Sequence, residues 1–137
     1  MPTSKVEYKG SLRTECTHIR SGQVIITDAP TDNHGKGEAF SPTDLAATSL
    51  ATCMITVMNI AAEGRNIKID GMHAEVTKIM AEHPRRISEI VIELTIDTAL
   101  NADQKELLEK IGLNCPVGLS LHPDIKQNIT FKYGKLA

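Results

Sequence analysis

Two cysteines in unusual local contexts are the residues of this chain best suited to do chemistry. Cys53 lies in a helical run that carries no charge from residue 45 to residue 62, and Cys115 opens what looks like a second helix. If the fold brings the two thiols together, one can attack an oxidant and the other can resolve the product as a disulfide. The alternative is a purely structural role for both, because free cysteine usually serves as a small buried apolar residue.

Cys115 has the more favourable local electrostatics of the two cysteines. Pro116 suits the first position of a helix, which places Cys115 at or beside the N-cap. Unpaired backbone N–H groups and the positive end of the helix dipole stabilise a thiolate at such a position. From position alone, an activated thiol and a small residue that is merely tolerated at a helix start are equally favoured interpretations of Cys115.

Cys53 lies about three turns inside its own helix, so the dipole of that helix gives its thiol little help. A reactive Cys53 needs a cation from elsewhere, and the N-terminal strands offer Arg13 and Arg20. Arginine is permanently charged, and its planar fork can hold a thiolate or a peroxide oxygen. For either arginine, the more common case is a solvated residue on a strand.

Asp44 is the nearest acid that precedes Cys53 in the sequence. Nine residues span roughly 13 Å and 900° of a straight helix, so the two side chains face opposite ways. Asp44 could therefore contact the Cys53 site only from another subunit, and otherwise it caps its own helix. Cys16 lies in a strand-like stretch without an activating neighbour, and we interpret it as structural.

The elements that must position these side chains follow an α+β order. β-favouring residues, punctuated by glycine and polar turns, predict strands within 4–29 (including 5–8 and 23–27) and at 68–76, 87–96 and 128–133. The helix signals fall between and after these strands. The order of strands and helices predicts an α+β fold with a mainly antiparallel sheet.

Three helices are predicted from their capping residues. Ser41, Pro42 and Asp44 mark the capped start of the long helix, and Gly64 is its expected C-cap. An amphipathic helix at 101–111 is capped by Asn101, and the short third helix begins at 115–116.

The uncharged run at 45–62 approaches a membrane span in length, but threonine, serine and asparagine interrupt it and much of the rest is alanine. A helix that is apolar on nearly every side is more often buried on several sides in a folded protein. A monomer of 137 residues would struggle to surround such a helix. We therefore expect this helix to be buried at a subunit interface.

Length and composition favour one domain spanning residues 1–137, with 41% hydrophobic and 23% charged residues. Aromatic residues make up only 3% and the net charge is −2, which disfavours nucleic-acid and membrane-surface partners. The N-terminus lacks an apolar signal core, so a cytoplasmic location is expected. Neither the three cysteines nor the five histidines have the close spacing typical of a metal site.

The combined motifs resemble those of the OsmC/Ohr family over nearly the whole chain. They comprise the helix start at 41–45, Cys53 in its uncharged helix, and Cys115-Pro116-Val117 with Ser120-Leu121 ahead of a terminal strand. The resemblance implies an intertwined homodimer with long central helices and active sites shared at the interface. Characterised members of the family are thiol-dependent peroxidases that reduce organic hydroperoxides.

By this resemblance Cys53 is the peroxidatic thiol and Cys115 the resolving thiol. An N-terminal arginine usually assists, and Arg13 is the best match, with Arg20 as the alternative. Peroxidase members usually carry Glu directly after the Pro of this helix start, where it holds the arginine. Here Thr43 takes that place and Asp44 follows it, a shift that turns a helical side chain by about 100°.

The sequence thus predicts a cytoplasmic Cys-based peroxidase that requires no metal, haem or flavin. Its substrate would be a small organic hydroperoxide, favoured by apolar neighbours such as Leu50 and Met54, and its reductant an external lipoyl-type dithiol. The alternative is a non-enzymatic OsmC-like dimer that senses redox state or binds a small apolar ligand in its interface cleft. Thr43 in place of the family's acid favours this alternative, and the loop at 34–38 resembles less-characterised OsmC-like branches.

Overall fold

The computed structural model describes residues 1–134, and the chain divides into two compact units, Met1–Ala46 and Ala47–Ala137. Three strands come first, then a long helix, two strands, two helices and a final strand. This order agrees with the one predicted from the sequence, and it confirms the α+β class. Within residues 1–134, the single turn of 3-10 helix at Thr31–Asn33 was not indicated by the sequence.

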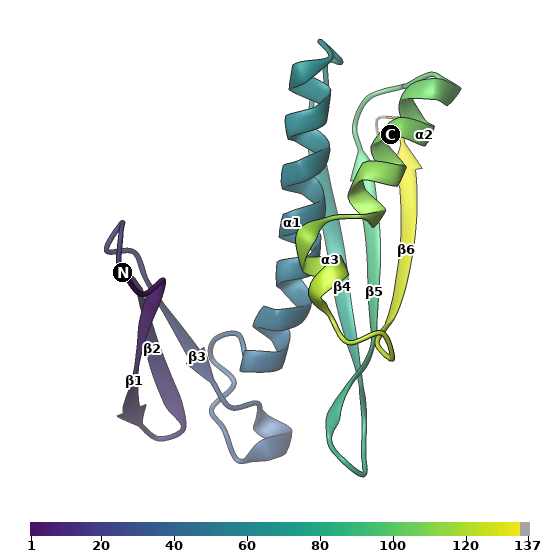
Figure 1. Ribbon diagram of the computed structural model, residues 1–137. Helices are drawn as coiled ribbons and strands as arrows, with labels where there is room; N and C mark the ends of the chain where they lie inside the picture. Colours follow the sequence, from purple (N-terminus) through teal and green to yellow (C-terminus); the bar gives the residue numbers. More distant parts are fainter. Residues whose placement is uncertain (135–137) are drawn as a thin grey trace. The chain divides into compact units, whose positions relative to one another are not determined.

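The first unit contains an antiparallel sheet of β1 (Ser4–Gly10), β2 (Arg13–His18) and β3 (Val24–Asp28), in that order (Figure 1). β1 and β2 are joined by a tight turn in which Ser11 and Leu12 both have positive φ, 54° and 62°. Turns of this kind suit the right-handed twist of a hairpin. The register then places Arg13, the first residue of β2, directly opposite Asp28, the last residue of β3.

Large apolar side chains on this sheet remain exposed. Val6 and Tyr8 on β1 are 61% and 67% exposed, and Val24 and Ile25 on β3 are 46% and 45% exposed. Burial of apolar area is the main stabilising contribution in small domains. Residues 4–28 therefore contribute little apolar core of their own.

The start of α1 (Pro42–Gly64) is the predicted capping box. The Ser41 hydroxyl accepts the Asp44 backbone N–H at 3.0 Å, and the Asp44 carboxylate accepts the Ser41 N–H at 3.0 Å. Pro42 occupies the first helical position, where the missing N–H costs nothing. Asp44 thus caps its own helix, one of the two roles that the sequence allowed it.

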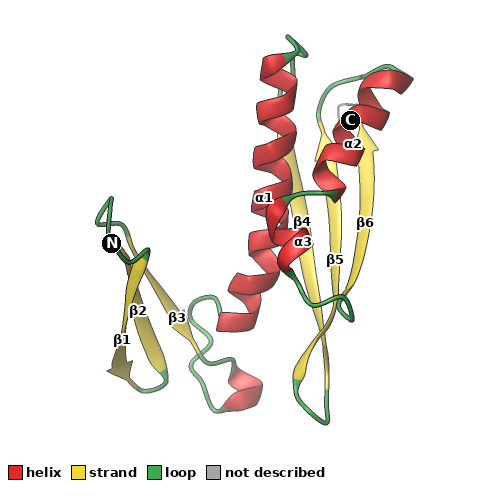
Figure 2. Cartoon of the chain, in the orientation of Figure 1, coloured by secondary structure: helices red, strands yellow, loops and turns green. Residues whose placement is uncertain are grey.

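The second unit is built on a sheet of β4 (Met72–Ala81), β5 (Arg86–Ile96) and β6 (Lys126–Tyr133), with β5 in the centre (Figure 2). β4 and β5 form an antiparallel pair. β6 runs parallel to β5, because α2 (Ala102–Leu113) and α3 (Pro116–Ser120) form the crossover that a parallel connection needs.

Alternate residues of β5 and one stripe of α1 form the core. Ile90, Ile92, Leu94 and Ile96 are fully buried on one face of β5, as period-two alternation predicts. Leu108 of α2 joins the same cluster. The buried residues of α1 recur at helical spacing, namely Ala47, Leu50, Ala51, Met54, Met58, Ala61 and Ala62. One face of the sheet is therefore covered by α1 and α2, as Figure 1 shows.

The opposite face of α1 is open in the single chain. Thr52 and Thr56 are exposed and donate back to helix carbonyls at 2.9 and 2.7 Å, and Ile60 is 65% exposed. By length and composition alone α1 could cross a membrane, a test that core helices of soluble proteins also pass. Within one chain, α1 is therefore not buried on the several sides that the sequence led us to expect. Its burial at a subunit interface stays a prediction.

Two boundary predictions were wrong. Gly64 is not the left-handed cap of α1, since that conformation falls on Asn66 with φ 54°. The Ile67 N–H donates to the Ala62 carbonyl and the Asn66 N–H to the Glu63 carbonyl, which is the Schellman arrangement. The strand expected at 68–76 instead covers Met72–Ala81, because its pairing with β5 begins opposite Ile96.

Candidate active site

The short helix α3 positions Cys115. Cys115 is its N-cap residue, with extended backbone angles, and its Sγ accepts the Gly118 backbone N–H at 3.4 Å. Pro116 follows at the first turn of the helix, as predicted from the sequence. The Cys115 side chain is buried, with the residue only 1% exposed.

Cys53 reaches the same helix start from α1. Its Sγ accepts the backbone N–H of Val117 at 3.5 Å, so consecutive N–H groups, those of Val117 and Gly118, serve the two different thiols. Cys53 is half-buried, whereas Cys115 is fully enclosed. Both cysteines are free, and the fold brings together the two sulfur atoms on which the sequence analysis depends.

The electrostatics of Cys115 differ from the sequence-based expectation. Burial raises the pKa of the Cys115 thiol, and the neighbouring Cys53 raises it further, whereas the N–H groups of Gly118 and Val117 lower it. The favourable helix start is therefore outweighed by desolvation, because removing a group from water disfavours its charged form. Cys115 is therefore a shielded thiol whose charged form is disfavoured, and Cys53 is the sulfur more open to an oxidant from solution.

Apolar side chains and a close helix contact enclose the pair. Leu50 and Met54, one turn before and one residue after Cys53, are each 1% exposed. A Cβ placed on Gly118 would lie 3.4 Å from Cys115 Sγ and 3.4 Å from Leu50 Cδ1. Gln127 of β6 donates to the Gly118 carbonyl at 3.0 Å. These contacts fix α3 against α1 and β6, and with it the two N–H groups that face the thiols.

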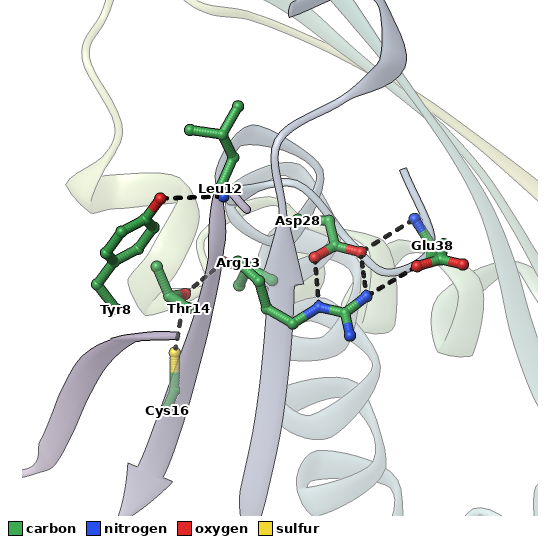
Figure 3. A network of polar contacts seen from close by, with 8 residues as sticks. Tyr8, Leu12, Arg13, Thr14, Cys16, Asp28 and Glu38 are labelled. Atoms are coloured by element: carbon green, nitrogen blue, oxygen red, sulfur yellow. Dashed lines mark hydrogen bonds and ion pairs between the residues drawn. The ribbon is translucent and has the colours of Figure 1, made fainter. Parts of the chain in front are cut away.

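Arg13 belongs to a separate polar network in the first unit. Its Nε donates to Asp28 Oδ1 at 2.7 Å and its Nη2 to Asp28 Oδ2 at 2.8 Å, a bidentate pair (Figure 3). The same Nη2 donates to Glu38 Oε1 at 3.1 Å. The Glu38 backbone N–H donates in turn to Asp28 Oδ2 at 3.1 Å.

This network keeps both charges in place. The Arg13 guanidinium holds the pKa of the Asp28 carboxyl below its usual value, although burial acts in the opposite direction. The Asp28 hydrogen bonds raise the pKa of Arg13 in return. Asp28 is 1% exposed and the Glu38 side chain is 64% exposed, so the Arg13 guanidinium pairs with one buried and one exposed carboxylate.

The other sequence-predicted residues belong to the first unit. Arg20 lines an open surface pocket of about 260 Å³ with residues 1–3 and His18. Cys16 lies half-buried on β2, with its Sγ 3.9 Å from the Thr14 hydroxyl. Within the described units, the structure groups Cys53 with Cys115, and Arg13 with Asp28 and Glu38. The parts that Arg13, Arg20 and Asp44 play in cysteine chemistry stay predictions.

Sequence reasoning missed Asp28 and Glu38. Asp28 ends a β-favouring stretch and Glu38 ends a polar loop, and both positions are usually solvated. The one signal that could have found Asp28 is the register of β2 against β3, which no local pattern specifies. Among residues 1–134, no group of three or more His, Cys, Asp or Glu side chains could hold a metal ion.

Comparison with known proteins gives the same fold and a family. A search of curated proteins found no match. A Psychrobacter arcticus protein, provisionally described as an osmotic stress induced and detoxification response protein, is 53% identical over 96% of both chains, with a TM-score of 0.93.

Two more distant solved structures share the fold. An organic hydroperoxide resistance protein OsmC from Legionella pneumophila is 18% identical, with a TM-score of 0.72, over 96% of this chain and 98% of that one. An organic hydroperoxide resistance protein from Elizabethkingia anophelis is 14% identical, with a TM-score of 0.75, over 97% of both. The family model described as OsmC-like protein matches residues 35–130. The chain therefore belongs to the OsmC-like family.

Proposed function

We propose that this protein is a thiol-dependent peroxidase that reduces organic hydroperoxides, with Cys53 as the attacking thiol and Cys115 as the resolving thiol. The supporting observation is that both cysteines contact the start of α3. The Val117 N–H donates to Cys53 Sγ at 3.5 Å, and Cys115 is the N-cap of the same helix. The names of the Legionella and Elizabethkingia proteins point in the same direction.

The chemistry proceeds in balanced steps. The Cys53 thiolate attacks the terminal oxygen of ROOH and the O–O bond breaks, so that Cys53 becomes a sulfenic acid. The alkoxide RO⁻ leaves and takes up the proton that the Cys53 thiol released on ionisation, which gives ROH. Cys115 then attacks that sulfur, the S–S bond forms, and the hydroxyl group leaves as water with the Cys115 proton. An external dithiol of the lipoyl type returns two electrons and two protons and restores both thiols.

Four further residues are assigned tasks in this scheme. The Val117 N–H donates to Cys53 Sγ at 3.5 Å and holds that sulfur at the start of α3. Leu50 and Met54 exclude water and favour an organic R group. Arg13 supplies the cation that orients the peroxide, because its guanidinium is permanently charged.

A homodimer and a cytoplasmic location complete the proposal. Exposed apolar side chains on β1 and β3, together with Ile60 on the open face of α1, support burial against a second copy of the chain. The absence of a close-spaced cysteine framework supports a reducing compartment, where free thiols persist.

Treatment of the reduced protein with one equivalent of cumene hydroperoxide tests the proposal. Mass spectrometry should then find a peptide pair that links Cys53 to Cys115, and Cys53→Ser should abolish it. Cys16→Ser is the matched control and should leave the link unchanged. Two unmodified thiols after several minutes would contradict the mechanism.

One observation favours a second candidate function, that of a redox sensor or small-ligand-binding dimer. Thr43, which stands where peroxidase members of the family carry the Glu that holds the arginine, has its hydroxyl 3.2 Å from that of Ser41. Steady consumption of hydroperoxide with dihydrolipoamide as the reductant separates the candidates. A peroxidase turns over many times, whereas a sensor is oxidised once and stops.

A further inference from the structure

We infer that Asp28 and Glu38 are positioning residues for Arg13, which fix its guanidinium so that the Nη1 edge is the one presented to a substrate oxygen. This inference rests on the proposed peroxidase function, in which Arg13 orients the peroxide. Asp28 and Glu38 contact Arg13 directly, whereas the hydrogen bond that the Asp44 carboxylate accepts from the Ser41 N–H caps α1.

Asp28 is the centre of the arrangement. Its Oδ1 accepts from Arg13 Nε at 2.7 Å, and its Oδ2 accepts from both Arg13 Nη2 at 2.8 Å and the Glu38 N–H at 3.1 Å. A bidentate carboxylate fixes the plane of a guanidinium as well as its position. Since Asp28 is 1% exposed, its carboxylate is protected from competing water.

Glu38 restrains the same edge from the exposed side. Its carboxylate contacts Nη2 at 3.1 Å, so both acids use the Nε–Nη2 edge of Arg13. In the part of the chain that the structure describes, Nη1 has no hydrogen-bond partner, and it carries no dashed line in Figure 3. The two acids thus leave a single pair of N–H donors available to an oxygen ligand.

The loop between Asp28 and Glu38 folds back so that Glu38 lies beside Asp28. Gly37 N donates to the Ala29 carbonyl at 3.2 Å, and Asp28 N donates to the Phe40 carbonyl at 3.0 Å. A Cβ on Gly35 would lie 1.6 Å from the Ala29 oxygen, so no other residue fits there without moving the backbone. Hydrogen bonds between the two ends of the loop therefore hold Glu38 beside Arg13.

The turn before Arg13 is strained and held on two sides. Ser11 and Leu12 have φ values of 54° and 62°, which are unfavourable for residues with a Cβ. The Leu12 N–H donates to the Tyr8 hydroxyl at 3.2 Å, and the Leu12 carbonyl accepts the Ala29 N–H at 3.1 Å. Strained backbone that its surroundings over-determine is typical of functional sites. Here it orients the first residue of β2.

A kinetic double-mutant cycle tests the positioning role. Glu38→Gln keeps the fold because Glu38 is exposed, and it should lower kcat/KM for cumene hydroperoxide about two- to fivefold, the factor expected of an exposed ion pair. In an Arg13→Gln background the same change should have no further effect, since Glu38 acts only through Arg13. Glu106→Gln, at an exposed site on α2, is the control and should behave as wild type.

Side-chain NMR tests the arrangement without reference to activity. The Arg13 Nε–H should exchange slowly with solvent in the wild type and rapidly in Asp28→Asn, while Glu38→Gln retains the slow Nε–H. Equal exchange in the wild type and Asp28→Asn overturns the inference, as does an equal loss of activity on Glu38→Gln in both Arg13 backgrounds. Absence of wild-type turnover instead overturns the proposed function, and the positioning role with it, whatever the NMR result.

Discussion

The backbone N–H of Val117 donates to Cys53 Sγ over 3.5 Å, although the two residues are 64 positions apart in the chain. The next N–H along, that of Gly118, donates to Cys115 Sγ. One turn of α3 therefore contacts both sulfur atoms, and burial distinguishes them, since Cys115 is buried and Cys53 is half-buried. This relationship makes the roles of the two cysteines separable by experiment.

Replacement of Cys115 by serine should trap the first intermediate. Cys53 can still attack the hydroperoxide, but no second thiol is present to convert the sulfenic acid to a disulfide. One equivalent of cumene hydroperoxide should therefore yield a dimedone adduct on Cys53 in Cys115→Ser, and far less in the wild type. Turnover with dihydrolipoamide should fall, because no intramolecular disulfide forms for the dithiol to reduce.

The double variant Cys53→Ser/Cys115→Ser is the control and should give no adduct at position 53. Cys16 remains in both proteins, so labelling there measures the background. An adduct found mainly on Cys16, or full turnover by Cys115→Ser, would show that the pair does not work as proposed.

The buried Cys115 thiol should make the reduced protein less stable in mild alkali. Its pKa is raised in the folded state, so above the ordinary cysteine value of about 8.5 the unfolded chain loses a proton that the folded chain keeps. The free energy of unfolding then falls as the pH rises from about 8.5. Urea unfolding between pH 7 and pH 10 measures this slope, and Cys115→Ala should flatten it.

Tyr133 offers a separate control for the alkaline measurements. Its pKa is also raised, by burial and by the hydrogen bond to Glu109, but the ordinary tyrosine value is about 10. Tyr133→Phe should therefore leave the slope between pH 8 and pH 10 intact and alter only the more alkaline range. An unchanged slope below pH 10 in Cys115→Ala would rule out the assigned cause.

Much of this fold could be predicted from local signals. The capping box at Ser41 and Asp44, and the alternation in β5, depend on neighbours a few residues away, and the structure contains both. The N-cap position of Cys115 followed from Pro116 in the same way. These features were predictable because the interactions that create them are themselves local.

The remaining features depend on pairing or burial, which no short window specifies. The contact of Arg13 with Asp28 arises from the register of β2 against β3, and the raised pKa of Cys115 from packing against α1. Gly64 was expected to end α1 because glycine is the commonest left-handed cap, but the chain uses Asn66 two residues later.

The end of α1 gives a direct test of that correction. Asn66 has φ 54°, so Asn66→Ala should destabilise the protein by about 1 kcal/mol, whereas Asn66→Gly should cost nothing. Gly64 is helical and a Cβ there meets nothing within 4 Å, so Gly64→Ala should stabilise by about 0.5–1 kcal/mol. Chemical denaturation measures the stability of all three variants, and a loss of stability in Gly64→Ala would support Gly64 as the C-cap.

Acid should weaken the fold through Asp28. Its pKa lies below the usual aspartate value of about 3.9, so it stabilises the folded state above that pH, and this contribution is lost as the pH falls through the lowered folded-state pKa. Asp28→Asn should therefore reduce the acid dependence of unfolding between pH 5 and pH 2. Arg13→Gln removes the main cause of the shift and should do the same. Wild-type acid dependence in both variants would contradict the ion pair.

Gly35→Ala distinguishes the contribution of the loop that carries Glu38 from that of the cysteine pair. The added methyl group would lie 1.6 Å from the Ala29 oxygen, so the backbone of the loop must move. The Cys53–Cys115 link should still form with cumene hydroperoxide, but kcat/KM should fall at least as far as in Glu38→Gln, about two- to fivefold. Gly64→Ala is the matched control, because its Cβ has open space. Wild-type kcat/KM in Gly35→Ala would mean that the placement of Glu38 by this loop does not affect the reaction.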